Sequence, residues 1–187
     1  MRYILASKSP RRRELLSEII KDFEIITKDV EESLPFDIHP REGVELLAIK
    51  KGEAVAEEAG EDSLVISSDT LVELGGVPLG KPTNENNAVR MLTSLSGKAH
   101  NVHTGVAVHY KGRVFSGVAT TAVYFREMSR EEILDYVKSG DPMDKAGAYG
   151  IQSGGGKFVE KYDGDYDTVV GLSVSLTKRL IDEATND

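Results

Sequence analysis

A run of three arginines opens the first predicted helix, at the helix end where positive charge is least favourable. Ser9 and Pro10 mark the helix start, because serine is a good cap and proline suits the first helical position. The first turn normally carries Asp or Glu, and each cation there costs about 0.3–1 kcal/mol against the helix dipole. The charge of Arg11–Arg13 therefore needs a reason, such as a bound anion.

Helical spacing separates these arginines into two kinds. Arg11 and Arg12 each lie one turn before a leucine of the buried stripe, whereas Arg13 aligns with polar residues and faces solvent. Free N–H groups at the helix start, two guanidinium groups and the hydroxyls of Ser7 and Ser9 together form a suitable cradle for phosphate. We favour phosphate binding over the alternative of three solvated arginines.

A carboxylate and a lysine extend the possible chemistry. Asp69 ends a predicted buried strand, where carboxylates of α/β sheets often face a ligand, although a turn aspartate is the plainer interpretation. Residues 75–81 have the spacing of a phosphate-binding P-loop, but Pro82 supplies no hydroxyl for Mg²⁺ and no helix follows at once. We therefore interpret the glycines as a hairpin turn, from which Lys81 can still reach a phosphate.

Several other polar and glycine residues favour structural interpretations. Glu31 and Glu32, in an acidic loop, are typical of surface charge. His100 and His103 are three residues apart in a predicted strand, so they point to opposite faces and predict no metal site. The glycines at 154–156 lack the context of a dinucleotide fingerprint and are interpreted as a flexible turn.

The predicted elements combine βα units with long hairpins. Strands are expected at 3–6, 23–27, 64–69, 100–110, 113–125 and 157–162, with a small Gly-Gly hairpin at 71–79. Helices are expected at 10–21, 41–59, 84–95, 129–139 and from residue 173 onward, and Ser129 with Glu132 forms a capping box. This mixture predicts one α/β domain over residues 1–187, with a mixed sheet and flanking helices.

The composition is that of an ordinary globular protein with an acidic balance. The 187 residues are 40% hydrophobic and 29% charged, and their net charge of −8 disfavours nucleic acid as the main partner. The lack of cysteine excludes disulfides, thiol nucleophiles and thiolate metal sites. No long apolar run or signal-peptide pattern is present, so we expect a cytoplasmic protein with no membrane partner.

Taken in order, the conspicuous segments resemble the Maf family, also called septum-formation inhibitor proteins. The resemblance covers nearly the whole chain through S-x-S-P-R-R-x-E-L-L at 7–16, V-E-E at 30–32, L-A-x-x-K at 47–51, S-D-T at 68–70, G-K-P at 80–82, M-L-x-x-L-S-G at 91–97, H-x-V at 100–102, Y-V-x-S-G-D-P at 136–142, D-K-A-G-A-Y-G-I-Q at 144–152 and G-D-Y-x-x-V-V-G-L at 164–172. Two residues depart from the family pattern: Thr168 replaces its usual Asn or Ala, and Ser173 its Pro.

The resemblance implies a nucleoside triphosphate pyrophosphatase, which uses water to convert a triphosphate into the monophosphate and pyrophosphate. It also implies the elongated two-lobed α/β fold of inosine-triphosphate pyrophosphatases, with a central cleft. Residues 144–152 resemble the branch of the family that acts on dTTP and UTP, with modified pyrimidine nucleotides as further candidate substrates. A homodimer is an additional expectation from the family.

The family's residue roles carry over to the matching positions of this sequence. Asp69 becomes the catalytic carboxylate and general base and, together with Glu32, a ligand of a divalent cation, Mg²⁺ or Mn²⁺. Arg11, Thr70 and Gln152 become specificity residues, and the Gln amide offers a donor and an acceptor to the O4 and N3–H of thymine and uracil. The expected phosphate ligands are Ser7, Ser9, Arg11, Arg12, Lys51 and Lys81.

Two other functions remain open from the sequence. One is hydrolysis of 7-methyl-GTP, the activity of a family branch whose sequence differs at 144–152. The other is a non-enzymatic regulator of cell division that only binds nucleotide or a protein partner, in line with the name septum-formation inhibitor. A pure binder needs the arginines but no carboxylate beside the scissile bond, so Asp69 favours an enzyme.

Overall fold

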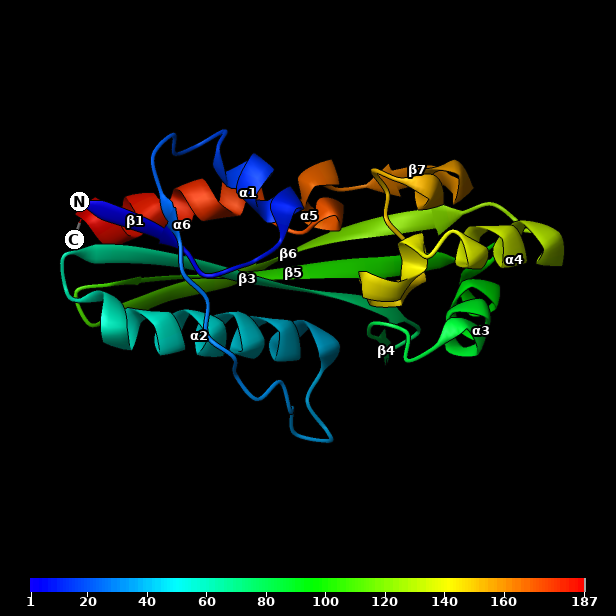
Figure 1. Ribbon diagram of the computed structural model, residues 1–187, viewed down its shortest axis with the longest axis horizontal. Helices are drawn as coiled ribbons and strands as arrows, with labels where there is room; N and C mark the ends of the chain where they lie inside the picture. The colour runs from blue at the N-terminus through cyan, green and yellow to red at the C-terminus, as the bar shows by residue number, and fades with distance from the viewer. Residues whose placement is uncertain (187) are drawn as a thin grey trace. The chain divides into compact units, whose positions relative to one another are not determined.

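A computed structural model describes residues 1–186, and it has a mixed α/β fold (Figure 1). The strands are β1 (Arg2–Leu5), β2 (Glu24–Ile25), β3 (Ser63–Leu74), β4 (Val77–Leu79), β5 (Ala99–Tyr110), β6 (Arg113–Phe125) and β7 (Val159–Asp163). The α-helices are α1 (Pro10–Leu16), α2 (Pro40–Ala59), α3 (Glu85–Leu95), α4 (Arg130–Lys138), α5 (Tyr166–Val170) and α6 (Val174–Asn186). Short 3-10 helices follow α4 at Asp141–Asp144, Ala146–Ala148 and Gly154–Phe158.

The strands form one mixed sheet of seven strands in the order β2-β1-β3-β5-β6-β7, with β4 paired to β3 outside this path. β1 runs parallel to both β2 and β3. β4 and β7 run antiparallel to their partners β3 and β6. The predicted α/β class with a mixed sheet is therefore confirmed.

The described chain forms two compact units. The first contains residues 1–70, 104–119 and the segment from Gly171 onward, and the second contains residues 71–103 and 120–170. The strands β3, β5 and β6 each contribute residues to both units. The prediction that residues 1–187 form a single domain stays a prediction.

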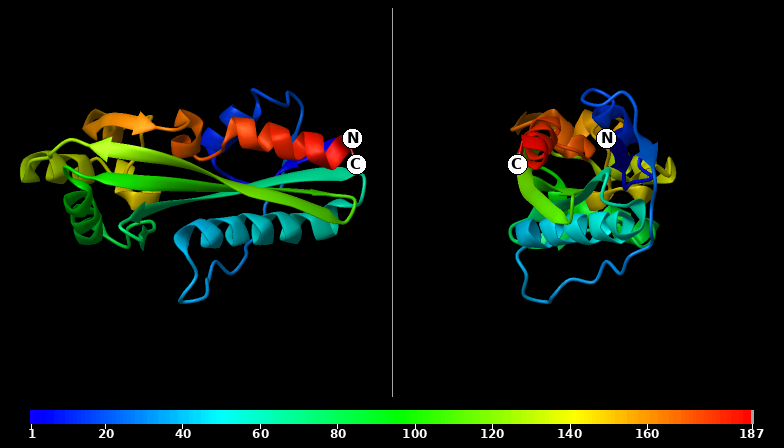
Figure 2. Two further views of the ribbon diagram at one scale, coloured as in Figure 1. Left: turned by 180° about the vertical axis from the view of Figure 1, so that it is seen from behind. Right: turned by 90° about the vertical axis from the view of Figure 1, so that its left-hand side faces the viewer.

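In the first unit, helices cover both faces of the sheet. α2 lies on one face, while α1 and α6 lie on the other (Figures 1 and 2). One core cluster joins β1 and β3 to α2 through Ile4, Ala6, Val55 and Val65. A strand covered on both faces has no solvent side, which explains why the first half of β3 is continuously buried.

In the second unit, α3 and α4 pack against each other and against the 3-10 helices. The core beside them is aromatic. Phe125 and Tyr149 meet edge to face with centroids 4.7 Å apart, and Tyr136 meets Phe158 in the same way at 5.3 Å. The capping box of Ser129 and Glu132 opens α4 as the sequence predicts.

Two predicted boundaries are wrong for local reasons. The helix expected at 10–21 ends at Leu16, because the Glu18 and Ile19 amides donate to carbonyls only three residues back, as in a 3-10 turn. The strand expected at 64–69 continues to Leu74, since its second half pairs with β4. The hairpin turn between them is confirmed, with φ of 59° and 84° at Gly75 and Gly76.

The segment between α4 and β7 differs most from the prediction. The glycines at 154–156 begin a 3-10 helix instead of a flexible turn. A Cβ on Gly155 would stand 2.9 Å from both the Gly150 carbonyl and the Tyr136 hydroxyl, so close packing requires glycine there. The short helix α5 was not predicted at all.

Candidate active site

Ser7 and Ser9 shape the turn between β1 and α1. The Ser9 amide donates to the Ser7 hydroxyl at 3.2 Å, and the Ser9 hydroxyl caps the helix by accepting the Arg12 amide at 3.4 Å. The predicted cap is therefore confirmed. Ser7 is buried and Ser9 half-buried, so both hydroxyls lie at the edge of the first unit's interior.

Arg12 extends from α1 into the first unit and is held by three protein oxygens. Its guanidinium donates to the Gly171 carbonyl at 2.8 Å, to the Thr70 hydroxyl at 3.2 Å and to the Ser7 hydroxyl at 3.4 Å. Burial lowers the pKa of Arg12, the negative charge of Asp69 counteracts this, and the charge of Arg11 lowers the pKa further. Arg12 therefore joins the helix, β3 and the chain before α6 around one guanidinium.

Arg11 is placed differently from Arg12 and Arg13. It is half-buried, and within residues 1–186 it makes no hydrogen bond or ion pair, yet it lies close enough to perturb Arg12. Arg13 is exposed, as the helical spacing predicts. Two guanidinium groups therefore repel each other at the start of α1, and an anion bound there would relieve that repulsion.

Lys51 brings the two predicted carboxylates together. Its Nζ lies 2.5 Å from Asp69 Oδ1 and 2.8 Å from Glu32 Oε1. The side chains of Lys51 and Asp69 are only 19% and 14% exposed, whereas that of Glu32, on its loop, is 61% exposed. Lys51, predicted as a phosphate ligand, thus links the catalytic candidate Asp69 to Glu32.

The strand segment around Asp69 is fixed on both sides by hydroxyl groups. Ser68 donates to the Gly171 carbonyl at 2.9 Å, and the hydroxyls of Thr70 and Thr104 lie 3.0 Å apart. Because the same Gly171 carbonyl accepts from Arg12, the Ser-Asp-Thr segment and the arginine helix share one anchor. Asp69 is thereby held in a fixed position relative to Lys51 and to α1, the helix that carries the arginines.

The described residues contain no cluster of three or more His, Cys, Asp or Glu side chains that could hold a metal ion. Glu32 and Asp69 nevertheless both direct a carboxylate oxygen to the same ammonium group. One or two protein carboxylates, completed by water and substrate phosphates, are a usual ligand set for Mg²⁺. The donor set therefore fits a hard divalent cation that the substrate helps to bind.

Lys81 and Gln152, the two remaining candidates, belong to the second unit, and both are exposed. Their segments are connected there, since the Gly147 amide donates to the Gly80 carbonyl at 3.1 Å. Of the predicted site residues, eight are therefore in the first unit and two in the second.

Sequence reasoning missed a polar network beside Gln152. Tyr136, Asp141, Lys145 and Ser153 are joined by hydrogen bonds in the 3-10 segment of the second unit. The signal available in the sequence was the matched segment Y-V-x-S-G-D-P, in which Tyr136 and Asp141 are five residues apart.

The two histidines predicted to lie on opposite faces of their strand are both buried, and each is hydrogen-bonded to other side chains. His100 Nε2 lies 2.8 Å from the Tyr149 hydroxyl, and burial lowers its pKa to about 4. His103 lies between Glu73 and Thr120, at 2.7 Å and 2.8 Å from its two ring nitrogens. These contacts explain why polar side chains are retained in a buried strand.

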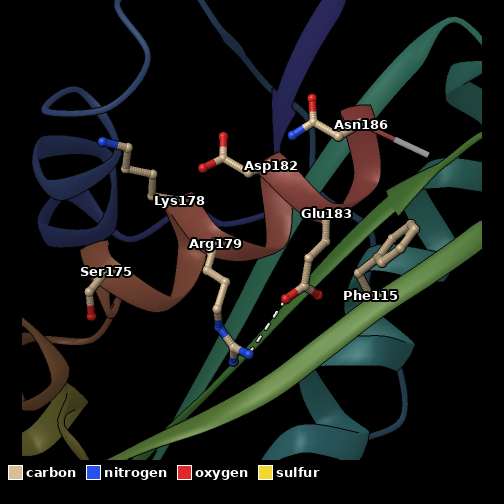
Figure 3. Close-up of a pocket in the computed structure, with 7 residues that line it drawn as sticks. All are labelled: Phe115, Ser175, Lys178, Arg179, Asp182, Glu183 and Asn186. Carbon is tan, nitrogen blue, oxygen red and sulfur yellow. Dashed lines mark hydrogen bonds and ion pairs between the residues drawn. The ribbon is translucent and has the colours of Figure 1, made fainter.

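A pocket of about 590 Å³ lies between α6 and β6 in the first unit (Figure 3). Its lining is of mixed charge, and Arg179 and Glu183 form an ion pair at its wall with 3.5 Å between Nη1 and Oε1. None of the predicted site residues lines it.

Among the described helices, none is long and apolar enough to cross a bilayer.

Comparison with known proteins gives matches over almost the full chain. A protein-family model described as "Maf-like protein" matches residues 2–184. The dTTP/UTP pyrophosphatase of Thermococcus kodakarensis is 46% identical over 177 residues, which are 95% of this chain and 94% of that protein. The proteins of the same name from Photorhabdus laumondii and Vibrio parahaemolyticus are 48% and 44% identical, with 95% and 96% of this chain covered and 91% and 95% of theirs.

A solved structure supports the fold. The Staphylococcus aureus Ham1 protein aligns with a TM-score of 0.50 and 19% sequence identity, over 67% of this chain and 72% of its own. At that identity the likeness concerns the fold alone.

Proposed function

Because this chain belongs to the Maf-like protein family, we propose that it is a nucleoside triphosphate pyrophosphatase that hydrolyses dTTP and UTP to the monophosphate and pyrophosphate. The observation that carries the proposal is the near full-length identity, 44–48%, to three proteins named dTTP/UTP pyrophosphatase. The chemistry of the first unit supports it independently, since it combines two adjacent guanidinium groups with a carboxylate pair.

The reaction places particular demands on the protein. A triphosphate carries roughly four negative charges near neutral pH, and water must reach the α-phosphorus. The water oxygen forms a bond to that phosphorus, and the bridging oxygen leaves with pyrophosphate. The protein must therefore neutralise phosphate charge, orient the water and accept its proton.

The first unit contains side chains that can meet these demands. Arg11 has no protein partner among the described residues and is the cation available to a phosphate. Arg12 is held by protein oxygens, so it positions the helix and contributes charge at a fixed place. Asp69 accepts the proton of the water, and Lys51, which it contacts, offsets the charge that the carboxylate carries.

Glu32 and Asp69 would hold the divalent cation, Mg²⁺ or Mn²⁺. When bound, the cation neutralises phosphate charge and lowers the pKa of a coordinated water. Lys51 holds the two carboxylates before the cation binds. Lys51, which contacts both carboxylates, would lie beside the phosphates of a bound triphosphate, and it is assigned to phosphate binding.

Base recognition is assigned to Thr70 and Gln152, with Arg11 as a third specificity residue. Lys81 is assigned to phosphate. The Gln152 side chain is exposed and offers both an amide donor and a carbonyl acceptor, which match the O4 and N3–H of a thymine or uracil base. A cytoplasmic location and a homodimer stay predictions from the family resemblance.

A substrate panel tests this function. Pyrophosphate release is measured with dTTP, UTP, CTP, GTP and 7-methyl-GTP, each with and without Mg²⁺. The proposal expects release from dTTP and UTP, dependent on the metal. Preference for 7-methyl-GTP would favour the other branch of the family, and nucleotide binding without any turnover would favour the regulator of cell division.

A further inference from the structure

Gln152 stands in a tight turn of the second unit. The Ser153 amide donates to the Gly150 carbonyl at 3.3 Å, which closes a four-residue turn with Gln152 in its third position. The side chain of Gln152 is exposed, whereas Ile151 beside it packs on the aromatic core. The turn therefore presents Gln152 outward from a fixed base.

Both ends of this turn are bound by one pair of side chains, Tyr136 and Asp141. At the first end, the Gly150 amide donates to the Tyr136 hydroxyl at 3.2 Å. At the other end, the Ser153 hydroxyl donates to Asp141 Oδ2 at 2.7 Å. The Tyr136 hydroxyl donates to the same Oδ2 at 2.6 Å, so the contacts form a closed ring.

The charge of Asp141 is balanced by Lys145. Its Nζ donates to Asp141 Oδ1 at 3.0 Å, to the Asp141 carbonyl at 2.7 Å and to Asp144 Oδ1 at 2.8 Å. Burial acts to raise the pKa of Asp141, but hydrogen bonds from Ser153, Tyr136 and Lys145 outweigh it and lower that pKa. Burial raises the pKa of Tyr136. The tyrosine thus remains a donor and the aspartate an ionised acceptor at neutral pH.

Glycines allow the close packing in and around this turn. A Cβ on Gly150 would stand 2.5 Å from the Ser153 hydroxyl, and one on Gly154 would stand 2.9 Å from the Tyr136 ring. The glycines therefore let the turn and the 3-10 helix after it lie directly on the Tyr136–Asp141 pair. Tyr136 belongs to α4, and the turn lies in the segment between α4 and β7 (Figure 1).

We propose that Tyr136 and Asp141 are positioning residues for base discrimination, which hold the turn of Gln152 at both ends and thereby fix the direction of its amide. The inference rests on the proposed function, because it takes Gln152 as the residue that reads the base. An amide that reads a donor–acceptor pattern must keep its orientation, and a loose turn reduces discrimination between substrates more than it reduces binding of their common phosphates.

The test uses Tyr136→Phe, which removes the hydroxyl and keeps the ring that packs on Phe158. The readout is the ratio of kcat/KM for UTP to that for CTP, which share the same ribose and phosphates. We expect this ratio to fall about tenfold, mainly through a higher KM for UTP. Tyr162→Phe is the matched control on exposed β7, and we expect it to leave the ratio unchanged.

Asp141→Asn is tested in the same way, against Asp144→Asn as its control. Both carboxylates contact Lys145, but Asp141 alone of the two joins the ring with Tyr136 and Ser153. We expect a lower ratio for Asp141→Asn and an unchanged ratio for Asp144→Asn. Thermal melting of all four variants is recorded alongside, because a merely structural role would lower the melting temperature while the ratio stays constant.

A double-mutant cycle shows whether the pair acts through Gln152. If it does, adding Tyr136→Phe to Gln152→Ala should not reduce the UTP/CTP ratio further. An equal reduction in both backgrounds, or no reduction in the wild-type background, overturns the proposal.

Hydrogen–deuterium exchange separates this proposal from the proposed function. We expect the amides of Gly150 and Ser153 to exchange about tenfold faster in Tyr136→Phe than in the wild type. Unchanged exchange overturns the proposal that Tyr136 and Asp141 hold this turn, whatever the enzyme's substrate. A wild-type protein that releases no pyrophosphate from UTP or dTTP overturns the proposed function instead.

Discussion

The ammonium of Lys51 lies 2.5 Å from Asp69 Oδ1, and both side chains are largely withdrawn from solvent. The lysine comes from α2 and the aspartate from β3, 18 residues later in the chain. Since Lys51 also contacts Glu32, its ammonium group holds together the two carboxylates that are assigned to metal binding and proton transfer. This arrangement gives Asp69 a fixed position before any substrate binds.

Replacing Asp69 by asparagine should abolish most turnover while keeping the fold. Asparagine has nearly the same size but accepts no proton, and general-base catalysis typically contributes about 10²–10⁴-fold to a rate. We therefore expect kcat for dTTP to fall at least about 100-fold, with nucleotide binding retained. The measurement is steady-state pyrophosphate release together with calorimetric binding of a non-hydrolysable dTTP analogue. A variant with near wild-type kcat would show that another group activates the water; Glu31→Gln, in the exposed loop, is the control.

The three arginines of α1 should respond differently to alanine. Arg11→Ala should raise KM for dTTP without lowering the melting temperature, since the side chain has no protein partner among the described residues. Arg12→Ala should raise KM and also lower the melting temperature, because it removes the guanidinium hydrogen bonds that link α1 to the Gly171 carbonyl and the Thr70 hydroxyl. Arg13→Ala is the control and should change neither quantity. Equal effects of all three substitutions would contradict the assignment from helical spacing.

Gln152→Glu should change base preference. Glutamate keeps the size of glutamine but loses the amide donor to O4 of thymine and uracil. A carboxylate facing O4 leaves two acceptors opposite each other, which weakens binding of dTTP and UTP in the transition state. We expect kcat/KM for dTTP and UTP to fall about tenfold or more, which corresponds to about 1.4 kcal/mol. CTP, whose amino group can donate to a carboxylate, should lose less or gain. A common decrease for all three nucleotides would mean that Gln152 does not read the base.

Stability should fall with decreasing pH in a way that depends on His100. Burial lowers the pKa of His100 from 6.5 to about 4 in the folded protein. The unfolded chain therefore binds a proton at His100 more readily than the folded protein does. The contribution of neutral His100 to the free energy of unfolding is complete above pH 6.5 and is lost as the pH falls toward 4. Between pH 7 and pH 5 the loss should approach about 2 kcal/mol.

Urea unfolding at those two pH values measures this effect. His100→Gln cannot titrate and retains an amide that can bond the Tyr149 hydroxyl, so its stability should fall less than that of the wild type. Because burial also lowers the pKa of His109, part of the pH dependence should remain. Identical pH dependence in the wild type and His100→Gln would contradict a buried neutral His100.

The features that the sequence predicted well are those decided by neighbouring residues. The capping box at Ser129, the Gly75–Gly76 turn and the separation of Arg13 from the other two arginines all follow from local geometry. The end of α1 at Leu16 did not, because the apolar spacing continues to Ile20 although the backbone changes to 3-10 hydrogen bonds after Ser17.

Contacts between distant segments were beyond sequence reasoning. The family resemblance pointed to both Lys51 and Asp69, but it did not indicate that Lys51 contacts Asp69 and Glu32. Residues 154–156 were interpreted as flexible because glycine is permissive, yet Gly154 and Gly155 are required by contact with Tyr136. In both cases the deciding partner lies on another element, so local sequence carries no trace of it.

The bond that is broken in the nucleotide tests the central claim most directly. The protein is incubated with dTTP and Mg²⁺ in water enriched in oxygen-18, and the products are separated and weighed by mass spectrometry. Attack on the α-phosphorus predicts thymidine monophosphate that carries one oxygen-18 atom, together with unlabelled pyrophosphate. Label in pyrophosphate, or thymidine diphosphate with labelled phosphate, would contradict the account.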